Sequence, residues 1–212
     1  MVVIGLTGGI GSGKSTVASL LADMGAQILD TDKLGHEVYL PETPGWHEVV
    51  DAFGKKILRP DGTVDRKKLG QVVFNRSEAL ARLNAIVHPR ILQVVQRRVK
   101  EWNRQRVAVV IIEAALLIEA GWSTSVDEVW VTIASEETVV RRLVEGHGVA
   151  EDDVRTRIQA QLSNQERRQH ADVLIRNDDN WEDLRDRVGQ LWFELCRRRG
   201  IALARFGHEA HG

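Results

Sequence analysis

A glycine-rich run with one lysine and one serine lies near the beginning of the chain. Residues 8–15 read Gly-Gly-Ile-Gly-Ser-Gly-Lys-Ser and match the pattern G-x-x-x-x-G-K-[ST]. Small residues let successive backbone N–H groups turn toward one anion, and a following helix points its positive end at the same charge. Lys14 would then reach the β- and γ-phosphates of a nucleotide, and the Ser15 hydroxyl would be a ligand for Mg²⁺. The apolar run before it and the helical spacing after it favour a nucleotide phosphate site over a plain glycine turn.

Two aspartates follow the next strand-like run, residues 26–30. Ligands bind at the carboxyl ends of parallel strands. We expect this run to neighbour the first strand, and alternation along an extended chain to turn Asp30 and Asp32 toward the glycine-rich loop. One carboxylate would orient an acceptor hydroxyl and take its proton, and the other would cap the following helix. Glu113 ends another strand at this edge, where it either holds Mg²⁺ through water, positions the acceptor or has a structural role.

Short β-branched runs alternate with helical segments, which is typical of α/β proteins with a parallel sheet. The run 107–113 is apolar almost throughout, so we expect it to be central in the sheet. The last helix is expected over about residues 181–199. The expected strands are residues 2–7, 26–30, 107–113, 129–134 and 173–176.

One long segment, residues 33–104, breaks the alternation because its apolar residues fall at helical spacing. We interpret it as a helical insertion that holds an acceptor. Pro89 is expected to start a second helix within it, which places His88 at a helix junction. The arginine-rich segment 141–168, with a break at residues 145–149, is expected to be a lid. The rest of the chain, taken with these segments as one unit, is predicted to be a nucleotide-binding core of residues 1–32, 105–140 and 169–200, followed by a frayed tail, 201–212.

Several classes of protein carry this type of phosphate loop. A GTP-binding switch needs an N-K-x-D tetrapeptide, which the sequence lacks, and a motor ATPase usually has far more chain. A small-molecule kinase fits a compact core, a helical insertion and an arginine-rich lid. The paired N–H donors of an arginine guanidinium can bind the γ-phosphoryl oxygens. Any single arginine here could instead pair with acidic neighbours on a solvated helix.

Composition sets wider limits on the partners and the compartment. The 212 residues include 29 Lys and Arg against 30 Asp and Glu. The net charge is therefore close to zero and gives no overall electrostatic attraction to nucleic acid or to an anionic membrane. No run of about 18 apolar residues and no basic leader occur, and Cys196 has no second cysteine to pair with. We therefore expect a cytoplasmic protein without a membrane segment, either a monomer or a weak homo-oligomer.

Taken together, the motifs resemble those of the dephospho-CoA kinase family over about residues 1–190. The aspartate pair, the Ile86-Val-His-Pro89 run and the Ala171-Asp172 pair followed by Asn177 make the combination far more specific than the loop alone. Further matching segments are residues 5–16, 62–69, 73–74, 116–119, 142–143 and 157–161.

The resemblance implies transfer of phosphate from ATP, with Mg²⁺, to the ribose 3′-hydroxyl of dephospho-CoA. It also implies a P-loop kinase fold with a five-stranded parallel core, a helical acceptor domain and a mobile lid. Asp32 resembles the acceptor-activating carboxylate, and Arg142 the first lid arginine. Asp30, His88 and Glu113 are expected on the substrate side. The expected ATP-binding residues are Gly11, Ser12, Gly13, Lys14, Ser15, Thr16 and, at the adenine pocket, Asn177.

The sequence departs from the family pattern in two respects. Ala115 stands where a proline is usual, and Gly146 and His147 stand where many members carry a second lid arginine. Arg141 or a partly charged His147 would have to replace that charge. Two alternatives therefore stay open: another small P-loop kinase, acting on a nucleoside monophosphate or a small hydroxylated metabolite, and a nucleotide-binding regulator without productive transfer.

Overall fold

The computed structural model describes residues 1–73 and 76–202, apart from the side chains of residues 36 and 147. The chain divides into two compact units, which are described separately. The first, the core unit, comprises residues 1–29 and the chain from residue 102 onward, and the second, the helical unit, comprises residues 30–101. Most of the expected frayed tail, from residue 203, lies outside the described residues. No helix in the described part of the chain is both long and apolar enough to cross a membrane.

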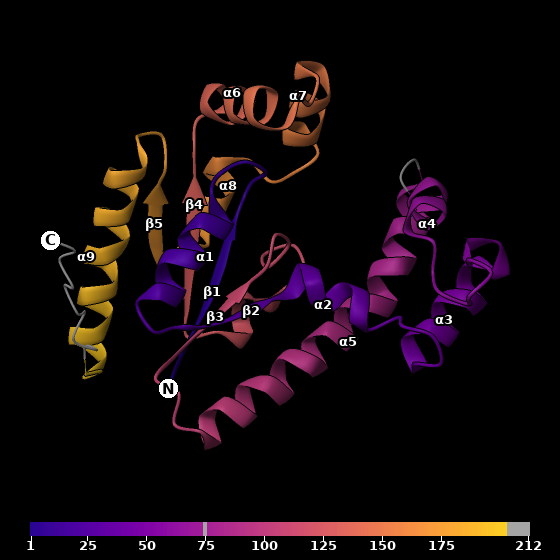
Figure 1. The fold of residues 1–212 in the computed structure, drawn as a ribbon, viewed down its shortest axis with the longest axis horizontal. Coiled ribbons are helices and arrows are strands. Elements are labelled where there is room, and N and C mark those ends of the chain that lie inside the picture. Colours follow the sequence, from indigo (N-terminus) through magenta and orange to yellow (C-terminus); the bar gives the residue numbers. More distant parts are fainter. Residues whose placement is uncertain (74–75, 203–212) are drawn as a thin grey trace, which may run out of the picture. The chain divides into compact units, whose positions relative to one another are not determined.

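A five-stranded parallel sheet organises the core unit, in the order β2-β3-β1-β4-β5 (Figure 1). The expectation that residues 107–113 form the central strand is wrong, because β1 occupies the middle and β3 lies between β1 and the edge strand β2. For the same reason β2 is not the hydrogen-bonded neighbour of β1. The strands are β1 (Val2–Gly8), β2 (Gln27–Asp30), β3 (Val109–Glu113), β4 (Glu128–Ile133) and β5 (Val173–Arg176).

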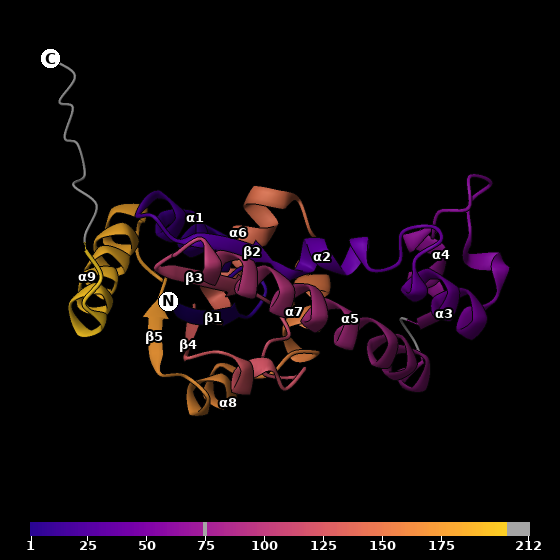
Figure 2. The same ribbon diagram turned by 90° about the horizontal axis from the view of Figure 1, so that it is seen from below.

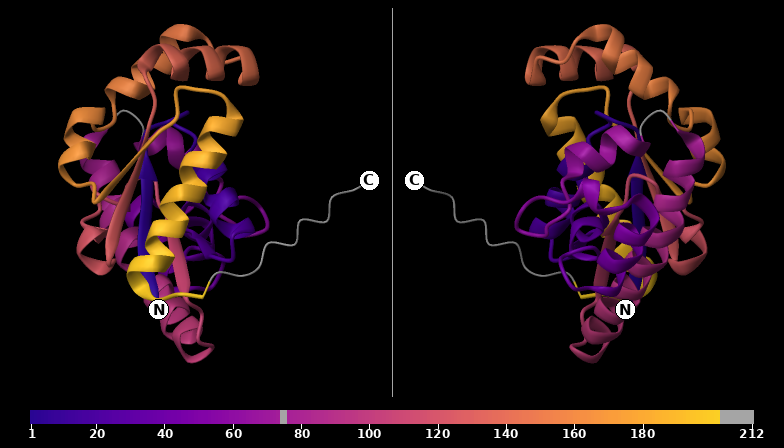
Figure 3. Two further views of the ribbon diagram at one scale, coloured as in Figure 1. Left: turned by 90° about the vertical axis from the view of Figure 1, so that its left-hand side faces the viewer. Right: turned by 90° about the vertical axis from the view of Figure 1, so that its right-hand side faces the viewer.

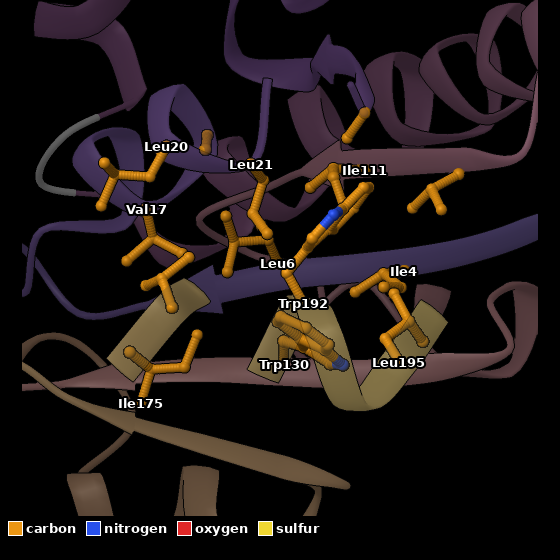
Figure 4. Close-up of a cluster of buried hydrophobic side chains, with 14 of the residues drawn as sticks. Ile4, Leu6, Val17, Leu20, Leu21, Ile111, Trp130, Ile175, Trp192 and Leu195 are labelled. Atoms are coloured by element: carbon orange, nitrogen blue, oxygen red, sulfur yellow. The ribbon is translucent and has the colours of Figure 1, made fainter. Parts of the chain in front are cut away.

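Strand β1 is buried along its whole length because helices cover both faces of the sheet. Helices α1 (Lys14–Asp23) and α9 (Trp181–Arg199) pack on one face, and α8 (Asn164–Gln169) lies on the other (Figure 2). Between α1, α9 and the sheet, aliphatic side chains surround Trp130 and Trp192 (Figure 4). Each large side chain fully buried there contributes about 1.5–3 kcal/mol, so the loop between β1 and α1 is held at both ends by a dense core.

Two helices that overlap the predicted lid, residues 141–168, lie beyond the carboxyl ends of the strands (Figure 3). They are α6 (Glu136–His147) and α7 (Glu151–Gln159). Ser135 caps α6 at its N-terminus by accepting a hydrogen bond from the Thr138 backbone N–H. Gly148, in the left-handed conformation with φ of 63°, ends it. The break expected at residues 145–149 is therefore present, and its cause is a glycine C-cap.

The helical unit has a separate apolar core, built around Val49, Phe53, Ile57 and Leu69. Apart from Asp30, the last residue of β2, its described residues contain no strand of the sheet, as the helical spacing predicts. The helices are α2 (Thr31–Glu37), α3 (Pro44–Phe53), α4 (Arg66–Val73) and α5 (Ser77–Arg104), the last of which continues past the unit's boundary, and a short 3₁₀ turn covers Lys55–Ile57.

Pro89 lies inside helix α5, so the expectation that it starts a new helix is wrong. Proline removes one backbone donor, which usually breaks or kinks a helix. The acceptor that loses its partner is the Ala85 carbonyl oxygen, and the Arg90 side chain donates to the neighbouring Ile86 carbonyl oxygen at 2.8 Å. Ile91 and Val95 are buried in the next turns, and their packing favours continuation of the helix.

Candidate active site

The phosphate loop, residues 8–15, connects the buried end of β1 to the first turn of α1. Gly11 and Gly13 have φ values of 66° and 90°, in the left-handed region that favours glycine. Position 13 also has no room for a side chain, because a Cβ there would lie 2.0 Å from Asn177 Nδ2. At Gly8 a Cβ would lie 2.1 Å from Thr132 Oγ1. The glycines of the motif are therefore required by backbone conformation and by contacts with distant parts of the chain.

Side chains from three other segments hold this loop in place. Asn177 Nδ2 donates to the Ser12 carbonyl oxygen at 2.8 Å. Ser12 Oγ and Thr132 Oγ1 are 2.8 Å apart, and Gln161 Oε1 accepts a hydrogen bond from the Ile10 backbone N–H at 2.9 Å. Asn177 follows β5, Thr132 belongs to β4, and Gln161 follows α7. The loop geometry is thus fixed before any ligand binds, which is what an anion site of backbone N–H groups requires.

Lys14, Ser15 and Glu113 form a charged cluster at the start of α1. Lys14 Nζ and Ser15 Oγ both lie 2.7 Å from Glu113 Oε1. The Lys14 and Glu113 side chains are only 12% and 7% exposed, so the pair is largely desolvated. Glu113 keeps the ammonium group at the loop, where it can exchange its carboxylate partner for phosphate oxygens.

The same cluster decides whether Mg²⁺ fits. A hydroxyl oxygen and a carboxylate oxygen are hard ligands of the kind Mg²⁺ prefers, and in kinases substrate phosphates and water complete its shell. No group of three or more His, Cys, Asp or Glu side chains placed to hold a metal occurs in the described residues. The donor set of Ser15 and Glu113 therefore fits an ion that arrives with a nucleotide.

A cavity of about 580 Å³ opens over the phosphate loop. Arg142 and Asn177 line it, and Arg142 Nη2 donates to Asn177 Oδ1 at 3.3 Å. The Asn177 amide is therefore shared between the loop backbone and the lid arginine. The other lining residues come from the loop and α1 (8–11 and 13–16), from the strand ends and lid (115, 143 and 161), and from the β5–α9 connection with the start of α9 (179–181 and 184).

The two aspartates are not on one side of an extended chain, so that expectation is wrong. Asp30 is the N-cap of α2, and its side chain accepts hydrogen bonds from the backbone N–H groups of Asp32 and Lys33 at 3.0 and 3.2 Å. Asp32 lies in the first turn of the helix. A helix that begins at residue 31 ends the alternation that the prediction assumed. The expected cap is confirmed for Asp30, whereas its expected place on the substrate side and the catalytic role of Asp32 stay predictions.

Opposing effects set the pKa of the Asp30 carboxyl. Partial burial acts to raise the pKa, but hydrogen bonds and charge from Lys33 and the bond from the Asp32 N–H outweigh it. The net pKa lies below the ordinary value. Asp30 is thus held as a carboxylate by its capping role.

Comparison with known proteins agrees with this geometry. The family model of dephospho-CoA kinase matches residues 2–183. The chain belongs to the dephospho-CoA kinase family. A dephospho-CoA kinase of Streptomyces avermitilis is 46% identical over 93% of this chain and 96% of its own length. That of Geobacter sulfurreducens is 43% identical, over 91% and 98%. The crystal structure of TT1252 from Thermus thermophilus has a TM-score of 0.78 and 32% identity, covering 92% of this chain and 97% of that one.

Within this dephospho-CoA kinase fold, the lid arginines differ in their surroundings. Arg142 is partly buried and lines the cavity, whereas Arg141 is exposed. Arg155 on α7 pairs with Glu136 and Glu151, as expected for an arginine on a solvated helix. The His147 side chain lies outside the described part of the structure, so the replacement of the second lid arginine stays a prediction.

The family's His-Pro run lies in the middle of α5 and not at a junction between helices. His88 is half-buried, and burial lowers the pKa of its imidazole below the ordinary value. A neutral imidazole is therefore favoured in the folded protein. Its expected place on the substrate side stays a prediction.

Arg167 is the buried residue that sequence reasoning missed. It is 3% exposed, its Nη1 donates to the Leu162 carbonyl oxygen, and its Nη2 lies 3.7 Å from Glu119 Oε1. Its Nε has no hydrogen-bond partner, and a Cβ at Gly9 of the phosphate loop would lie 3.5 Å from its Nη1.

The position of Arg167 had a signal in the sequence. Ser163 and Glu166 form a capping box, which fixes where α8 begins and therefore which side chain points inward. Burial lowers the pKa of Arg167 against the opposing charges of Glu119 and Glu166. The residue places a desolvated cation beside the loop that is expected to bind phosphate.

Proposed function

We propose that this chain transfers the γ-phosphoryl group of ATP to the ribose 3′-hydroxyl of dephospho-CoA, giving coenzyme A and ADP, the last step of coenzyme A synthesis. The observation that carries the proposal is the preformed phosphate loop with Lys14 and Ser15 converging on Glu113, in a member of this family. Phosphoryl transfer depends mainly on positioning and on charge stabilisation, and this cluster has the groups for both.

On the nucleotide side, the loop and the lid bind and polarise the triphosphate. Backbone N–H groups of residues 11–16 surround the β-phosphate, and Lys14 neutralises charge on the β- and γ-phosphates. Arg142, which lines the same cavity, donates to γ-phosphoryl oxygens as charge builds on them. Asn177 supports the adenine end while its amide keeps the loop in position.

We propose that Mg²⁺ accompanies ATP and that Ser15 and Glu113 hold it. When bound, the ion neutralises phosphate charge. Ser15 Oγ is already oriented by Glu113 at 2.7 Å, so little rearrangement is needed to expose its lone pairs. Glu113 also keeps Lys14 at the loop until phosphate oxygens take the ammonium group over.

On the acceptor side, we propose that Asp32 orients the 3′-hydroxyl and takes its proton. It lies two residues after the Asp30 cap, and the bond from its N–H to that side chain fixes its backbone in the first turn of α2. Asp30 and His88 belong to the same helical unit, which is our candidate for binding dephospho-CoA. A carboxylate in this role contributes about 10²–10⁴-fold to the rate.

Coupled measurement of ADP release with a panel of acceptors tests the function. Release that depends on dephospho-CoA supports the proposal. Release with a nucleoside monophosphate or another hydroxylated metabolite instead would identify a different small kinase. ATP binding with no turnover on any acceptor would identify a regulator. The cytoplasmic location, the absence of nucleic-acid partners and the monomeric or weakly associated state stay predictions from composition.

A further inference from the structure

One tryptophan of the core unit differs from the others in its surroundings. Trp122, Trp130 and Trp192 are 8%, 0% and 6% exposed and belong to the interior, and Trp102 is partly buried. Trp181 is 55% exposed and also lines the cavity over the phosphate loop. Exposure alone does not distinguish Trp181, because Phe193 on the same helix is 53% exposed. The difference is that the Trp181 ring lines a cavity, where its flat apolar surface is available to a ligand.

The backbone around Trp181 is firmly fixed. The residue is the first of helix α9, and the preceding Asn180 caps the helix by accepting a hydrogen bond from the Asp183 N–H at 2.9 Å. Leu184, one turn later, is 3% exposed, belongs to the main core and lines the same cavity. The ring is therefore presented by a rigid support, so a ligand that contacts it does not have to order a loop.

A cation covers part of the ring. The Arg185 guanidinium carbon lies 5.2 Å from the ring centroid, within the range of a cation–π contact. Arg185 does not line the cavity, whereas Trp181 does. The arginine thus holds the indole from outside the cavity and leaves ring surface for a second planar partner.

We propose that Trp181 is the platform on which the nucleobase of the bound triphosphate stacks. The inference rests on the proposed function, since it assigns the base end of the same nucleotide site. The phosphate loop and the β5–α9 connection contribute to one cavity of about 580 Å³, a size suited to a small-molecule ligand. The loop holds the charged end of the nucleotide, and the planar, apolar base is the part that an indole recognises. Stacking accepts any base, so Trp181 provides affinity for a base rather than a strict choice of one.

Titration with two ligands distinguishes the contribution of the base to the affinity from that of the phosphates. ATP and inorganic triphosphate, each with Mg²⁺, are titrated calorimetrically into the full chain, the Trp181→Ala and Trp181→Phe variants, and Phe193→Ala as a matched control. Phe193 is on the same helix, is 53% exposed and does not line the cavity. We expect Trp181→Ala to weaken ATP binding about 5- to 150-fold, the range for losing one base–aromatic stack. Triphosphate binding should change less than twofold.

The conservative variant and the control complete the test. Trp181→Phe should keep most of the affinity for ATP because it keeps a ring, and Phe193→Ala should bind both ligands as the parent does. Unchanged ATP affinity in Trp181→Ala, or an equal loss for both ligands, would overturn the proposal. ATP should also quench the emission of the parent protein but not of Trp181→Phe, and quenching that persists in the variant would contradict stacking. Failure of the parent to bind ATP at all would instead refute the proposed function.

Discussion

The phosphate loop and the Asp30–Asp32 segment both follow a strand of the sheet, but different forces hold them. Distant side chains hold the loop: Asn177 bonds its backbone and excludes any side chain at position 13. The aspartate segment is organised locally, by the Asp30 side chain and the two N–H groups that follow it. The loop is a product of tertiary structure, and the aspartate segment is a product of a helix cap.

This difference shows which substitutions should affect chemistry and which should affect stability. Near the loop, Lys14 and Arg142 face a cavity and have charge for a ligand. At the aspartates, Asp30 uses its carboxylate on the chain itself, whereas Asp32 contributes its backbone N–H to that cap. Removing a group that acts on a ligand should reduce turnover, and removing a cap should reduce the free energy of unfolding.

The largest effect is expected for Lys14→Ala. No other side chain of the phosphate loop supplies a positive charge to the β- and γ-phosphates, and a charge of this kind in phosphoryl transfer is worth about 10³-fold or more. Steady-state ADP release should fall by that order while circular dichroism shows an intact fold. Lys100→Ala is the control, at an exposed lysine of α5. Turnover of Lys14→Ala close to that of the parent would refute the assignment of the loop.

The next effect is expected for Asp32→Asn. The amide keeps the shape of the side chain but removes the proton acceptor, so turnover should fall about 10²–10⁴-fold while the Kd for ATP changes little. Rates with dephospho-CoA and calorimetric titration with ATP check both parts. If Asp30→Asn proves crippling while Asp32→Asn is tolerated, the two carboxylates have been assigned in reverse.

Arg167→Met tests the buried arginine beside the phosphate loop, which the sequence analysis did not identify. The change leaves the Leu162 carbonyl oxygen without its donor, and a buried acceptor without a partner costs about 1–3 kcal/mol. Urea unfolding should show that loss in the free energy of unfolding. Arg168→Met is the matched control, one residue further along the same helix at an exposed position, and should stay within about 0.5 kcal/mol of the parent. Equal losses in the two variants would contradict a specific role for Arg167.

The sequence predicts the core unit well where local signals agree with the fold. The last helix has its predicted bounds, because Asn180 caps it and Gly200 ends it in the left-handed conformation. The phosphate loop follows from a motif in which Gly8, Gly11 and Gly13 are needed for conformation or space. The order of the strands does not follow, because placing β3 between β1 and β2 depends on pairing between strands that the apolar pattern alone cannot distinguish.

The helical unit shows where local signals fail to predict the structure. Its helical character follows from the spacing of apolar residues, but Pro89 misleads as a boundary because α5 continues through it, with Ile91 buried in the following turn. At the site, residue types identify Lys14 and Glu113, whereas the contacts of Gln161 and Arg167 join segments about 150 residues apart. Such contacts have no local signature, so only the folded chain reveals them.

A smaller effect is expected for Asp30→Ala. Loss of an N-cap costs about 1 kcal/mol, and Asp30→Asn should cost less because asparagine also caps helices well. Because the folded pKa of Asp30 is lowered, its contribution is present above the unfolded pKa of about 3.8 and is lost as the pH falls through the folded value. Urea titrations at pH 7 and pH 3 should therefore show a difference between Asp30→Ala and the parent that shrinks in acid. A difference that grows in acid would contradict the cap.

The smallest effect is a pH dependence from His88. Burial lowers the folded pKa of this imidazole below 6.5, so as the pH drops under that value the unfolded chain takes up a proton while the folded chain resists it. The free energy of unfolding should fall from about pH 6.5 downward and level off once the pH is below the folded pKa. His88→Gln should remove this part of the slope, whereas His47→Gln, at a side chain that is 56% exposed, should keep it. Urea unfolding of the three proteins between pH 5 and pH 8 measures the slopes, and identical slopes for the parent and His88→Gln would show that burial of His88 has no energetic consequence.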